Sequence, residues 1–407
     1  MTDHDDLLPR AEAVDRVLAI RAAALADRPA ERVPLDRIAG RTAAKAVVAD
    51  ADHPPQDFAT MDGFAFDATD PYPLELTQDD VFPEDQPPAI GAGEAVPIAT
   101  GAPLPSGANA VLKREEATVT DGHLEGTQIE PGTYVYGRGS NVAAGETLFE
   151  AGERLSPKDA ILLGDVDVED VSVHERFAVA VLATGTEIHE GRAQDLDSSM
   201  LAGLVRSWGH DATYEGSVPD DYDRVEGRIA ELAEAYDVVL TTGGTSVGKK
   251  DYVIRALGAL GDVDFHRAAV RPGKPIAAAR LPDQDAYAFA IPGKPVGAHM
   301  ITTLVARPFF TGDPSLPTID ATLARDVGIG PAGFDYAVPV TVEGDGDPPE
   351  AMPLGHVDSR LQVYEETYDP SVLSSSTRAT RADGFFITTE GRTAGETVRV
   401  VPYPVVE

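Results

Sequence analysis

The sequence contains no cysteine, and this absence excludes several kinds of chemistry. Disulfide bonds, cysteine-ligated metal sites and thiol catalysis cannot occur in this chain. Long hydrophobic runs are also missing, because no stretch approaches the roughly 18 consecutive apolar residues that a membrane helix needs. The opening segment MTDHDDLLPR is acidic and lacks the basic and apolar regions of a signal peptide. We therefore expect a cytoplasmic protein with no membrane-spanning segment.

Basic residues are scarce, since 33 lysines and arginines stand against 68 aspartates and glutamates, for a formal net charge of −35. The acidic residues are spread through every region, so they do not form a local interaction tail. Such a surface suits a salt-rich cytoplasm, where screening reduces self-repulsion. A surface that binds cations or basic partners is the alternative. Nucleic-acid binding through a broad basic face is not expected.

Lysine is especially rare, and its distribution is uneven. The chain has only seven lysines, and four of them fall within 46 residues: Lys249, Lys250, Lys274 and Lys294. In a chain that otherwise avoids lysine, this clustering is most simply explained by a local anion-binding site.

The length of 407 residues is too great for one ordinary core, so several domains are expected. Residues 5–50 carry apolar positions at helical spacing and predict two helices, the second within PLDRIAGRTAAKAVVAD. SPKDAILLGDV predicts another helix, with Ser156 as N-cap and Pro157 at the first helical position, which packs back on the first two. We therefore expect residues 5–50 and 146–173 to form one elongated helical and β domain. Prolines and glycines punctuate short β-like runs at 51–145, which predicts an inserted small β module.

Residues 174–315 alternate between apolar strands and helices. FAVAVLAT and DVVLTT are near-continuous apolar runs, typical of strands that are buried on both faces. Helical patterns occur in DSSMLAGLVRSWG, DDYDRVEGRIAELAEAY and YVIRALGAL. This alternation predicts a doubly wound, mostly parallel α/β sheet, whose ligands bind beyond the carboxyl ends of its strands. Residues 316–407 again contain short β-like runs separated by turn residues, and they predict a separate small β domain.

The segment TTGGTSVGKKDY follows one of these strands and turns into a helix. Gly243 and Gly244 permit tight backbone geometry and the close approach of a ligand. The free N–H groups and the helix N-terminus favour an anion, and two lysines lie near that positive end. Asp251 is either a capping residue or a functional carboxylate. The segment is neither a Walker loop nor G-x-G-x-x-G, and we predict that it is the anion-binding turn of an active site.

Two near-copies of another turn follow, RPGKP and IPGKP. The apolar runs between them, IAAAR and AYAFAI, are joined by LPDQD and predict a β-hairpin. Antiparallel strands bring Pro275 and Pro292 to the same end, so that Lys274 and Lys294 converge there. The alternative is a pair of rigid turns with solvated lysines.

Several acidic residues are candidates by their positions. Glu187 comes after FAVAVLATGT, at the carboxyl end of a predicted strand. Asp220 and Asp221 begin a long helix, so capping accounts for one of them and leaves a metal or phosphate role for the other. Asp62 precedes a glycine, and an Asp-Gly pair taken alone indicates only an ordinary turn. The nine histidines show no metal-ligand spacing, and the sequence suggests no Ser/His/Asp grouping.

Six motifs in order carry a specific resemblance: MDGFAF, TGAPLPSGANAVLKREE, ATGTEI, TTGGTSVGKKDY, AVRPGKPIA and AIPGKPVGA. Their order and rough spacing are similar to those of the MoeA family, the molybdopterin molybdenumtransferases, which are related to the C-terminal domain of gephyrin. The resemblance covers nearly the whole chain, including the tail LSSSTRATRADGFFITTEGRTAGETVRV. It implies a MogA/MoaB-like α/β domain, an inserted β module, a helical N-terminal part and a small C-terminal β domain.

The reaction that this resemblance implies is the insertion of molybdate, or tungstate, into adenylylated molybdopterin with release of AMP. A divalent cation such as Mg²⁺ takes part, and the phosphate-bearing substrate would account for the lysine cluster. Family members are usually homodimers, with a site between the sheet domain of one subunit and the β module of the other. Transfer of the product to molybdoenzymes or other cofactor-biosynthesis proteins is a further implied partnership.

The resemblance also assigns roles to residues by their place in the motifs. It implies Asp62, Glu187 and Asp251 as catalytic residues. The implied metal ligands are Glu187, Asp251 and Asp221, with Asp220 as the alternative to Asp221. The implied substrate-binding residues are Thr242, Gly243, Gly244, Ser246, Gly248, Arg271, Lys274, Pro292, Lys294 and Pro295.

The chain departs from the family pattern at several positions. Ala143 and Ala144 stand where an arginine-rich stretch is common, and Thr147 stands where a carboxylate is usual. Thr186 replaces a frequent aspartate, Lys294 replaces a common asparagine, and GPAGFDYAVPV lacks the usual flanking arginines. These changes concern oxyanion coordination and the subunit-bridging part of the pterin site. Three alternatives therefore stay open: a paralogue specialised for tungstate or another pterin, a pterin-binding scaffold without turnover, and a relative that shares only the sheet domain.

Overall fold

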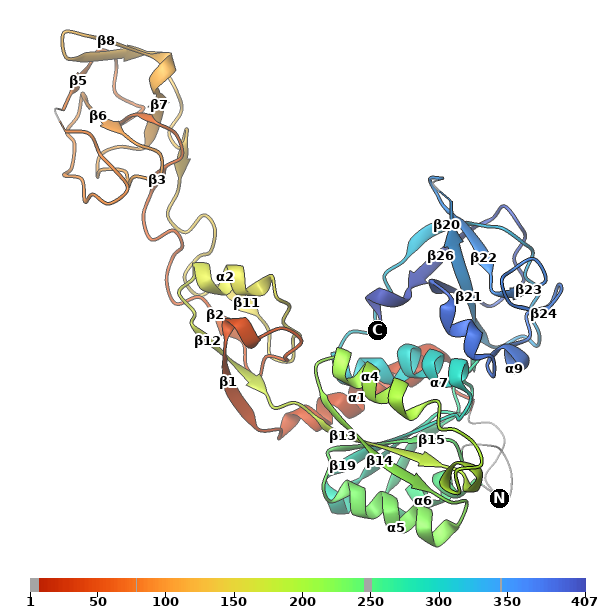
Figure 1. Ribbon diagram of the computed structural model, residues 1–407. Coiled ribbons are helices and arrows are strands. Elements are labelled where there is room, and N and C mark those ends of the chain that lie inside the picture. The colour runs from red at the N-terminus through yellow and green to blue at the C-terminus, as the bar shows by residue number, and fades with distance from the viewer. Residues whose placement is uncertain (1–6, 78, 245–250, 345) are drawn as a thin grey trace. The chain divides into compact units, whose positions relative to one another are not determined.

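The computed structural model describes residues 7–77, 79–244, 251–344 and 346–407. These residues form two compact units, drawn in Figure 1, each with apolar clusters of its own. Unit 1 holds the described residues up to Glu31, together with Ala39–Arg41 and His174–Glu407, and unit 2 holds Arg32–Ile38 and Thr42–Val173. No helix in the described part of the chain is long and apolar enough to cross a membrane.

The centre of unit 1 is a mixed, mostly parallel sheet. Across it the strands lie in the order β14 (Asp211–Val218), β13 (Ala178–Thr184), β15 (Val238–Thr242), β19 (Ala286–Ile291), β18 (Ala277–Leu281) and β16 (Asp262–His266). β13 pairs in parallel with β14 and β15, and β15 pairs in parallel with β19. The apolar runs that form β13 and β15 are buried almost throughout, as expected of strands covered on both faces. The predicted doubly wound sheet is confirmed, with β18 as an antiparallel strand within it.

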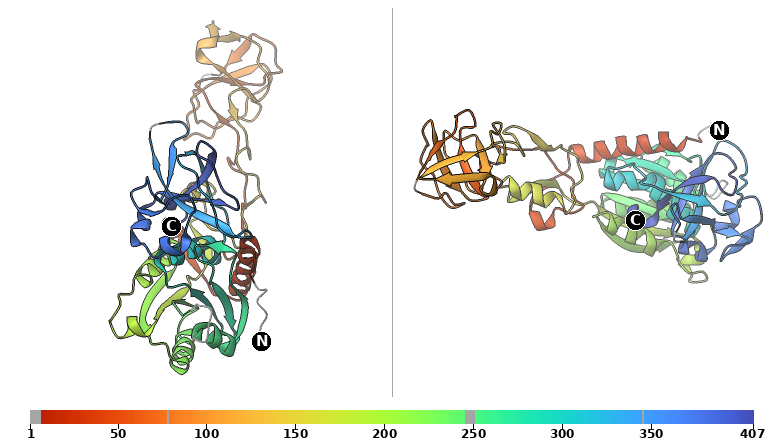
Figure 2. Two further views of the ribbon diagram at one scale, coloured as in Figure 1. Left: turned by 90° about the vertical axis from the view of Figure 1, so that its right-hand side faces the viewer. Right: turned by 90° about the horizontal axis from the view of Figure 1, so that it is seen from above.

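Helices cover both faces of this sheet (Figures 1 and 2). One face carries α5 (Tyr222–Ala233) and α6 (Tyr252–Leu260). Val225 of α5 and Leu257 of α6 lie in one apolar cluster with Val239 of β15. The other face carries α1 (Arg10–Ala26), α4 (Ser198–Ser207), α7 (Pro295–Ile301), the π-helix Thr302–Ala306 and α8 (Arg307–Thr311). The parallel strands therefore all present their carboxyl ends at one edge, where ligands of such sheets bind.

The first helix has different partners from those predicted. α1 belongs to unit 1, where its Ala13, Val17 and Ile20 are buried in the same core as Phe309 of α8. Its apolar positions recur at helical spacing and so form a single stripe that the helices on the sheet can cover. The predicted grouping with 146–173 therefore fails for the residues up to Glu31, whereas 32–38 and 42–50 lie in unit 2 with 146–173.

The second predicted helix is reduced to a single 3-10 turn, Leu35–Arg37. The chain bends at Gly40, whose φ of 74° no helix contains, and later forms the short strand β2 (Val47–Val48). The predicted helix after Ser156 is α2 (Asp159–Asp165), and it contacts this 3-10 turn within unit 2.

The tail forms a barrel-like sheet that shares the core of unit 1. Its strands are β20 (Ile319–Leu323), β21 (Asp335–Glu343), β22 (Glu350–Pro353), β25 (Gly384–Thr388) and β26 (Thr397–Pro402). The sheet closes because β21 pairs with both β22 and β25. β17 (Val270–Arg271) pairs with β21 and so brings the first PGKP turn to the barrel. The predicted small β domain is therefore present, and it lies within unit 1, where Phe385 and Phe289 belong to one apolar cluster.

Unit 2 contains the predicted β module. Its larger sheet has the order β7 (Ala110–Lys113), β4 (Gly63–Phe66), β6 (Glu94–Ile98), β5 (Leu74–Leu76), β9 (His123–Gly126) and β8 (Ala117–Thr120). Phe64 and Phe66 lie in one apolar cluster and Ala65 in another, because alternate side chains of a strand point to opposite faces. Its shorter strands are β3 (Phe58–Ala59), β10 (Val135–Tyr136) and β11 (Thr147–Phe149), and the paired strands β1 (Ala30–Pro34) and β12 (Asp170–His174) lie at the boundary of the two units.

Candidate active site

A cavity of about 610 Å³ lies in unit 1 at the carboxyl ends of β13, β15 and β19. This volume is within the range of about 300 to 1,000 Å³ that is common for small-molecule sites. Residues that follow these strands line it, together with both PGKP turns and part of the tail. Of the predicted site residues, it brings together Glu187, Thr242, Gly243, Gly244, Arg271, Lys274, Pro292 and Lys294.

Glycine is required where β15 ends at the floor of this cavity. Gly243 has a φ of 88°, and a Cβ there would lie 2.7 Å from Thr184 O. Its N–H donates to Ile291 O at 3.0 Å, which fixes the turn against β19. A Cβ on Gly293 would in turn lie 3.0 Å from the Cα of Gly243. The two turns therefore pack backbone to backbone, which side chains at these positions would prevent.

The basic side of the cavity is built by the predicted hairpin. β18 and β19 pair antiparallel, with Ala277 opposite Ala290, so the turns at their ends lie together as expected. Lys274 and Lys294 both line the cavity. The prediction that the two lysines converge is therefore confirmed.

Arg271 strengthens this basic side. Its guanidinium carbon lies 4.3 Å from the centre of the Phe334 ring, a cation–π contact that holds the side chain in place. Its Nε is buried and has no hydrogen-bond partner among the described residues. An unpaired donor of this kind is stabilised by an anionic ligand.

The tail contributes to the cavity, which the sequence alone did not indicate. Pro370, Ser371 and Ser374 line it, next to α9 (Pro370–Leu373). Lys294 Nζ donates to Ser371 O at 3.1 Å. Val296 N donates to Ser374 O at 3.1 Å. Lysine in place of the asparagine that is common in the family thus ties the second PGKP turn to the tail.

The acidic side of the cavity holds Glu187, Asp197 and Asp220. Glu187 lies in α3 (Thr186–His189), directly after β13. Asp220 accepts a hydrogen bond from Thr186 N at 3.3 Å, and Thr186 Oγ1 accepts one from Asp220 N at 3.0 Å. Thr186, a departure from the family pattern, therefore positions a cavity carboxylate. Asp197 was missed because it precedes a helix and resembles a capping residue in sequence.

Asp220 and Asp221 have different surroundings. Asp221 is the N-cap of α5, and its Oδ1 accepts a hydrogen bond from Arg224 N at 3.0 Å. Capping accounts for this carboxylate, and Asp220, not Asp221, is the one that lines the cavity. The geometry favours Asp220 over the predicted Asp221 as a functional residue.

We expect substitutions at these two neighbours to separate stability from activity. Asp221→Ala should lower the free energy of unfolding of unit 1 by about 1 kcal/mol, because it removes a cap, and should leave substrate turnover within about threefold. Asp220→Ala should lower turnover by at least about tenfold with a smaller effect on stability. Turnover and urea unfolding of both variants measure this. Equal activities would contradict the distinction.

Asp251 is the N-cap of α6, where its Oδ1 accepts a hydrogen bond from Ile254 N at 3.4 Å. Burial raises the pKa of this carboxyl to about 6, although that bond and the charge of Arg267 oppose the shift. Its Oδ2 lies 4.0 Å from His266 Nε2. The capping role therefore holds, and a functional role for Asp251 stays a prediction.

Some predicted residues cannot be placed in the cavity. Ser246, Gly248, Lys249 and Lys250 lie outside the described residues. Pro295 occupies the first turn of α7 and is not among the described lining residues. Its fixed φ favours the start of a helix, which accounts for its position.

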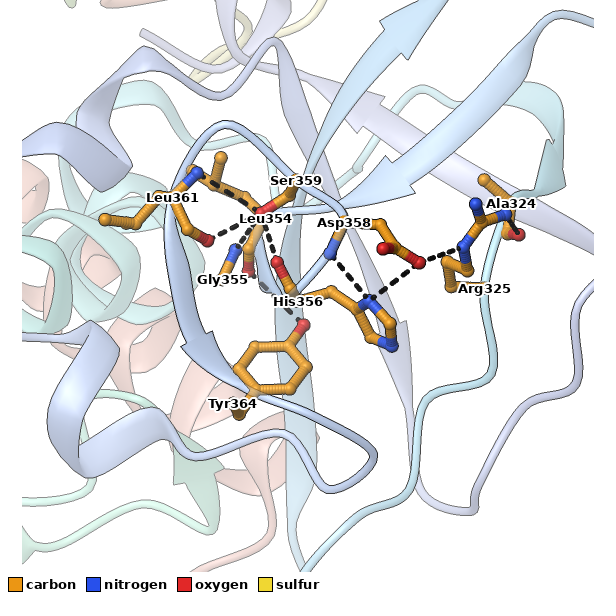
Figure 3. Close-up of polar contacts among 9 residues, drawn as sticks. All are labelled: Ala324, Arg325, Leu354, Gly355, His356, Asp358, Ser359, Leu361 and Tyr364. Carbon is orange, nitrogen blue, oxygen red and sulfur yellow. Dashed lines mark hydrogen bonds and ion pairs between the residues drawn. The ribbon is translucent and has the colours of Figure 1, made fainter.

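A serine, a histidine and an aspartate also lie close together in the tail barrel (Figure 3). His356 Nδ1 is 4.0 Å from Asp358 Oδ2, whose carboxylate Arg325 Nε binds at 2.7 Å. Ser359 Oγ, however, contacts the backbone oxygens of His356 and Leu361 at 2.8 Å and 2.6 Å. A nucleophilic serine needs its hydroxyl on the imidazole, so this cluster stabilises a turn.

Known proteins share both parts of this architecture. Residues 8–166 match the family model described as the MoeA N-terminal region (domain I and II), and residues 180–312 match the one described as a probable molybdopterin binding domain. A solved structure, described as the molybdopterin biosynthesis MoeA protein from Pyrococcus horikosii, is similar with a TM-score of 0.69 and 28% identity. The similarity covers 98% of this chain and 99% of that one. This chain belongs to the MoeA family.

Curated relatives agree with this membership. The molybdopterin molybdenumtransferase of Synechococcus elongatus is 29% identical over 298 residues, which are 68% of this chain and 74% of that protein. The molybdopterin molybdenumtransferase of Haemophilus influenzae is also 29% identical over 298 residues, 68% of this chain and 72% of its own length. Because the MoeA match includes the N-terminal region, a relative that shares only the sheet domain is excluded.

Unit 2 carries the remaining predicted site residue of this MoeA-family chain. Asp62 is exposed, and its Oδ1 accepts hydrogen bonds from Thr100 N at 2.7 Å and Thr100 Oγ1 at 2.8 Å. The backbone bond and then the hydroxyl bond hold the pKa of this carboxyl below its usual value. Asp62 is therefore a fixed, charged carboxylate on the surface of the β module.

The stretch where the chain departs from the MoeA pattern lies in the same unit. Ala144 N donates to Asp52 Oδ1 at 2.9 Å, and Ala143 N donates to Glu146 Oε2 at 3.1 Å. Asp52 also binds Arg138 Nε at 2.7 Å. Thr147 is exposed and begins β11. The stretch is an ordered turn held by its own Glu146 and by the distant Asp52.

The resemblance to the MoeA family implies Mg²⁺, and the cavity carboxylates could supply only some of its ligands. No group of three or more His, Asp or Glu residues in the described ranges could hold a metal ion by itself. Glu187 and Asp220 both line the cavity. Mg²⁺ is often bound by one or two carboxylates together with substrate phosphates and water. The donors present therefore fit an ion that arrives with a phosphorylated substrate.

Proposed function

We propose that this chain is a molybdopterin molybdenumtransferase, which inserts molybdate or tungstate into adenylylated molybdopterin and releases AMP. The observation that carries this proposal is the charge arrangement of the cavity. Three basic residues, Arg271, Lys274 and Lys294, line a cavity in the described structure that also holds three carboxylates. The names of the curated relatives support the same reaction.

The basic residues suit the phosphate groups of the substrate. Arg271 offers an unpaired, buried Nε–H, and Lys274 adds a second charge on the same turn. Charge-assisted hydrogen bonds of this type are the strongest that side chains make to phosphate. Gly243 and Gly244 line the same cavity. These residues bind and orient the substrate.

The carboxylates suit the cation and the release of AMP. Glu187 and Asp220 would hold Mg²⁺, which, when bound, neutralises charge on the phosphate and the oxyanion. Asp251 would complete the set from the start of α6, where burial already raises the pKa of its carboxyl to about 6.

We further propose that the protein works as a cytoplasmic homodimer in which Asp62 of one subunit serves the cavity of the other. This proposal explains why Asp62, a carboxylate fixed by hydrogen bonds, is in unit 2 while the cavity is in unit 1. Delivery of the product to molybdoenzymes or other cofactor-biosynthesis proteins is the expected next partnership. Light scattering in high salt measures the oligomeric state, and a monomer would contradict the shared site.

The experiment that tests the reaction is AMP release from adenylylated molybdopterin by the full chain, with Mg²⁺ and molybdate in high salt. We expect release by the wild type and by Asp223→Asn, an exposed carboxylate on α5. Asp251→Asn should lose at least about 100-fold in rate. Equal release by Asp251→Asn would overturn its assigned role.

The same assay separates the alternatives. Release with tungstate but not molybdate would identify a tungstate-specific paralogue. Binding of the adenylylated pterin without AMP release from either oxyanion would identify a scaffold and overturn the transferase proposal.

A further inference from the structure

Asp197 lies at the start of α4 but does not cap it. Its side chain makes no hydrogen bond to the first turn of the helix. Asp195 takes that place, because its Oδ1 accepts hydrogen bonds from Asp197 N and Ser198 N, both at 3.1 Å. The carboxylate of Asp197 is therefore not required for the local fold of the helix.

The side chain of Asp197 lines the cavity and is only 6% exposed. Its Oδ2 accepts a hydrogen bond from Thr242 Oγ1 at 3.1 Å. Its Oδ1 is buried and has no partner among the described residues. A buried carboxylate oxygen without a donor costs free energy, so this atom is satisfied only when something in the cavity donates to it.

No described basic side chain compensates this carboxylate. Burial raises the pKa of Asp197 to about 6, the Thr242 bond lowers it, and the charge of Asp195 raises it further. The basic residues of the cavity do not contribute to this balance. Because no described residue donates to this oxygen, which faces the cavity, a donor on a bound ligand fits it.

We propose that Asp197 recognises the nitrogen edge of a pterin ring, accepting hydrogen bonds from its N3–H and 2-amino groups. The inference rests on the proposed function and names the group that orients the substrate in it. Two donors on adjacent positions of a planar heterocycle match the two oxygens of one carboxylate, as in bidentate pairs. Arg271 and Lys274 line the same cavity and would bind the phosphate of the same molecule. Asp197 is thus a positioning and specificity-determining residue.

The substitution Asp197→Asn tests this assignment with little change of shape. The amide oxygen can still accept the bond from Thr242, while an NH₂ group replaces the unpartnered oxygen and repels a donor. Two fluorescent probes are compared: 6-hydroxymethylpterin monophosphate and 6-hydroxymethyllumazine monophosphate, in which a carbonyl oxygen replaces the 2-amino group. Asp223→Asn is the matched control because it removes an exposed carboxylate from the same unit.

Fluorescence titrations of the full chain in high salt should give a clear pattern. The wild type and Asp223→Asn should bind the pterin probe at least about tenfold more tightly than the lumazine probe. Asp197→Asn should lose about 10- to 100-fold in affinity for the pterin probe and lose little or none for the lumazine probe. Far-UV circular dichroism of the variant should match that of the wild type.

Other outcomes would overturn the assignment in distinguishable ways. Equal wild-type affinity for both probes, or an equal loss for both in Asp197→Asn, would overturn the role of Asp197 alone. A loss that occurs only when Mg²⁺ is present would assign Asp197 to the cation and also overturn it. Failure of the wild type to bind either probe would overturn the proposed pterin substrate together with this inference.

Discussion

Replacing Lys274 and Lys294 together by alanine should weaken the binding of a phosphorylated pterin by at least about 100-fold, because each lysine offers a charge-assisted hydrogen bond worth about 1.5 to 3 kcal/mol. Both side chains line the cavity, and Lys294 also donates to Ser371 O. Fluorescence titration with 6-hydroxymethylpterin monophosphate at fixed salt measures the effect. The double variant should fold, since neither side chain is buried in the core.

The effect should be large because the rest of the protein opposes an anion. The formal net charge of −35 makes the long-range field repulsive to a phosphate, so local cations must provide the attraction. We expect the ratio of the wild-type affinity to that of the double variant to fall as salt rises, because screening weakens the lysine–phosphate attraction that only the wild type has.

Two control variants sharpen this prediction. Lys158→Ala removes an exposed lysine from unit 2 and should leave the affinity within about twofold. Arginine at both cavity positions keeps the charge and should recover most of the binding. A loss below about threefold in the alanine variant would mean that the two lysines are solvated turn residues, the alternative that the sequence left open.

The α/β sheet was predictable because its signals are local. Strands such as β13 and β15 are buried on both faces and are therefore apolar throughout. The hairpin of β18 and β19 was predictable because two turns bracket two apolar runs. From these two features, the place of the cavity and the convergence of Lys274 and Lys294 follow.

The errors concern partners that are distant in sequence. The apolar stripe of α1 shows that the helix packs on something, but it does not show whether Phe309 or α2 is the partner. The stretch after Leu35 has helical spacing, and yet Gly40 ends the regular structure. The tail forms the small β domain that was predicted, but its sequence does not show that Phe385 packs into the same core as Phe289.

The cavity residues with local sequence signals were predicted, whereas those that reach the cavity through contacts distant in sequence were not. Glu187, Gly243 and Gly244 carry local signals, because they follow buried strands. Ser371 and Ser374 reach the cavity only through tertiary packing, and nothing in their local sequence indicates it. Asp197 and Asp221 both precede helices, so their roles as cavity carboxylate and cap could be distinguished only by the contacts of their oxygens.

Asp197→Asn should also stabilise unit 1 at neutral pH, by about 2 to 3 kcal/mol. The physical reason is the buried carboxylate, whose pKa rises from 3.8 to about 6 in the folded chain. Between these two values the folded state binds more protons than the unfolded state, so this residue lowers the stability as pH rises. The gain from asparagine should therefore be complete above pH 6 and absent below about pH 4.

Urea unfolding followed through Trp208, the single tryptophan, measures this gain because the ring is buried in the core of unit 1. The free energy of unfolding of Asp197→Asn is compared with that of the wild type at each pH, so that the titration of the other carboxylates cancels. The control Asp223→Asn should have the same free energy of unfolding as the wild type at every pH. A gain that is the same at every pH would contradict the titration of Asp197. If the gain appears while pterin binding falls, the chain retains a destabilising carboxylate whose unpartnered oxygen serves the ligand, which is the stability–activity trade-off expected of a binding residue.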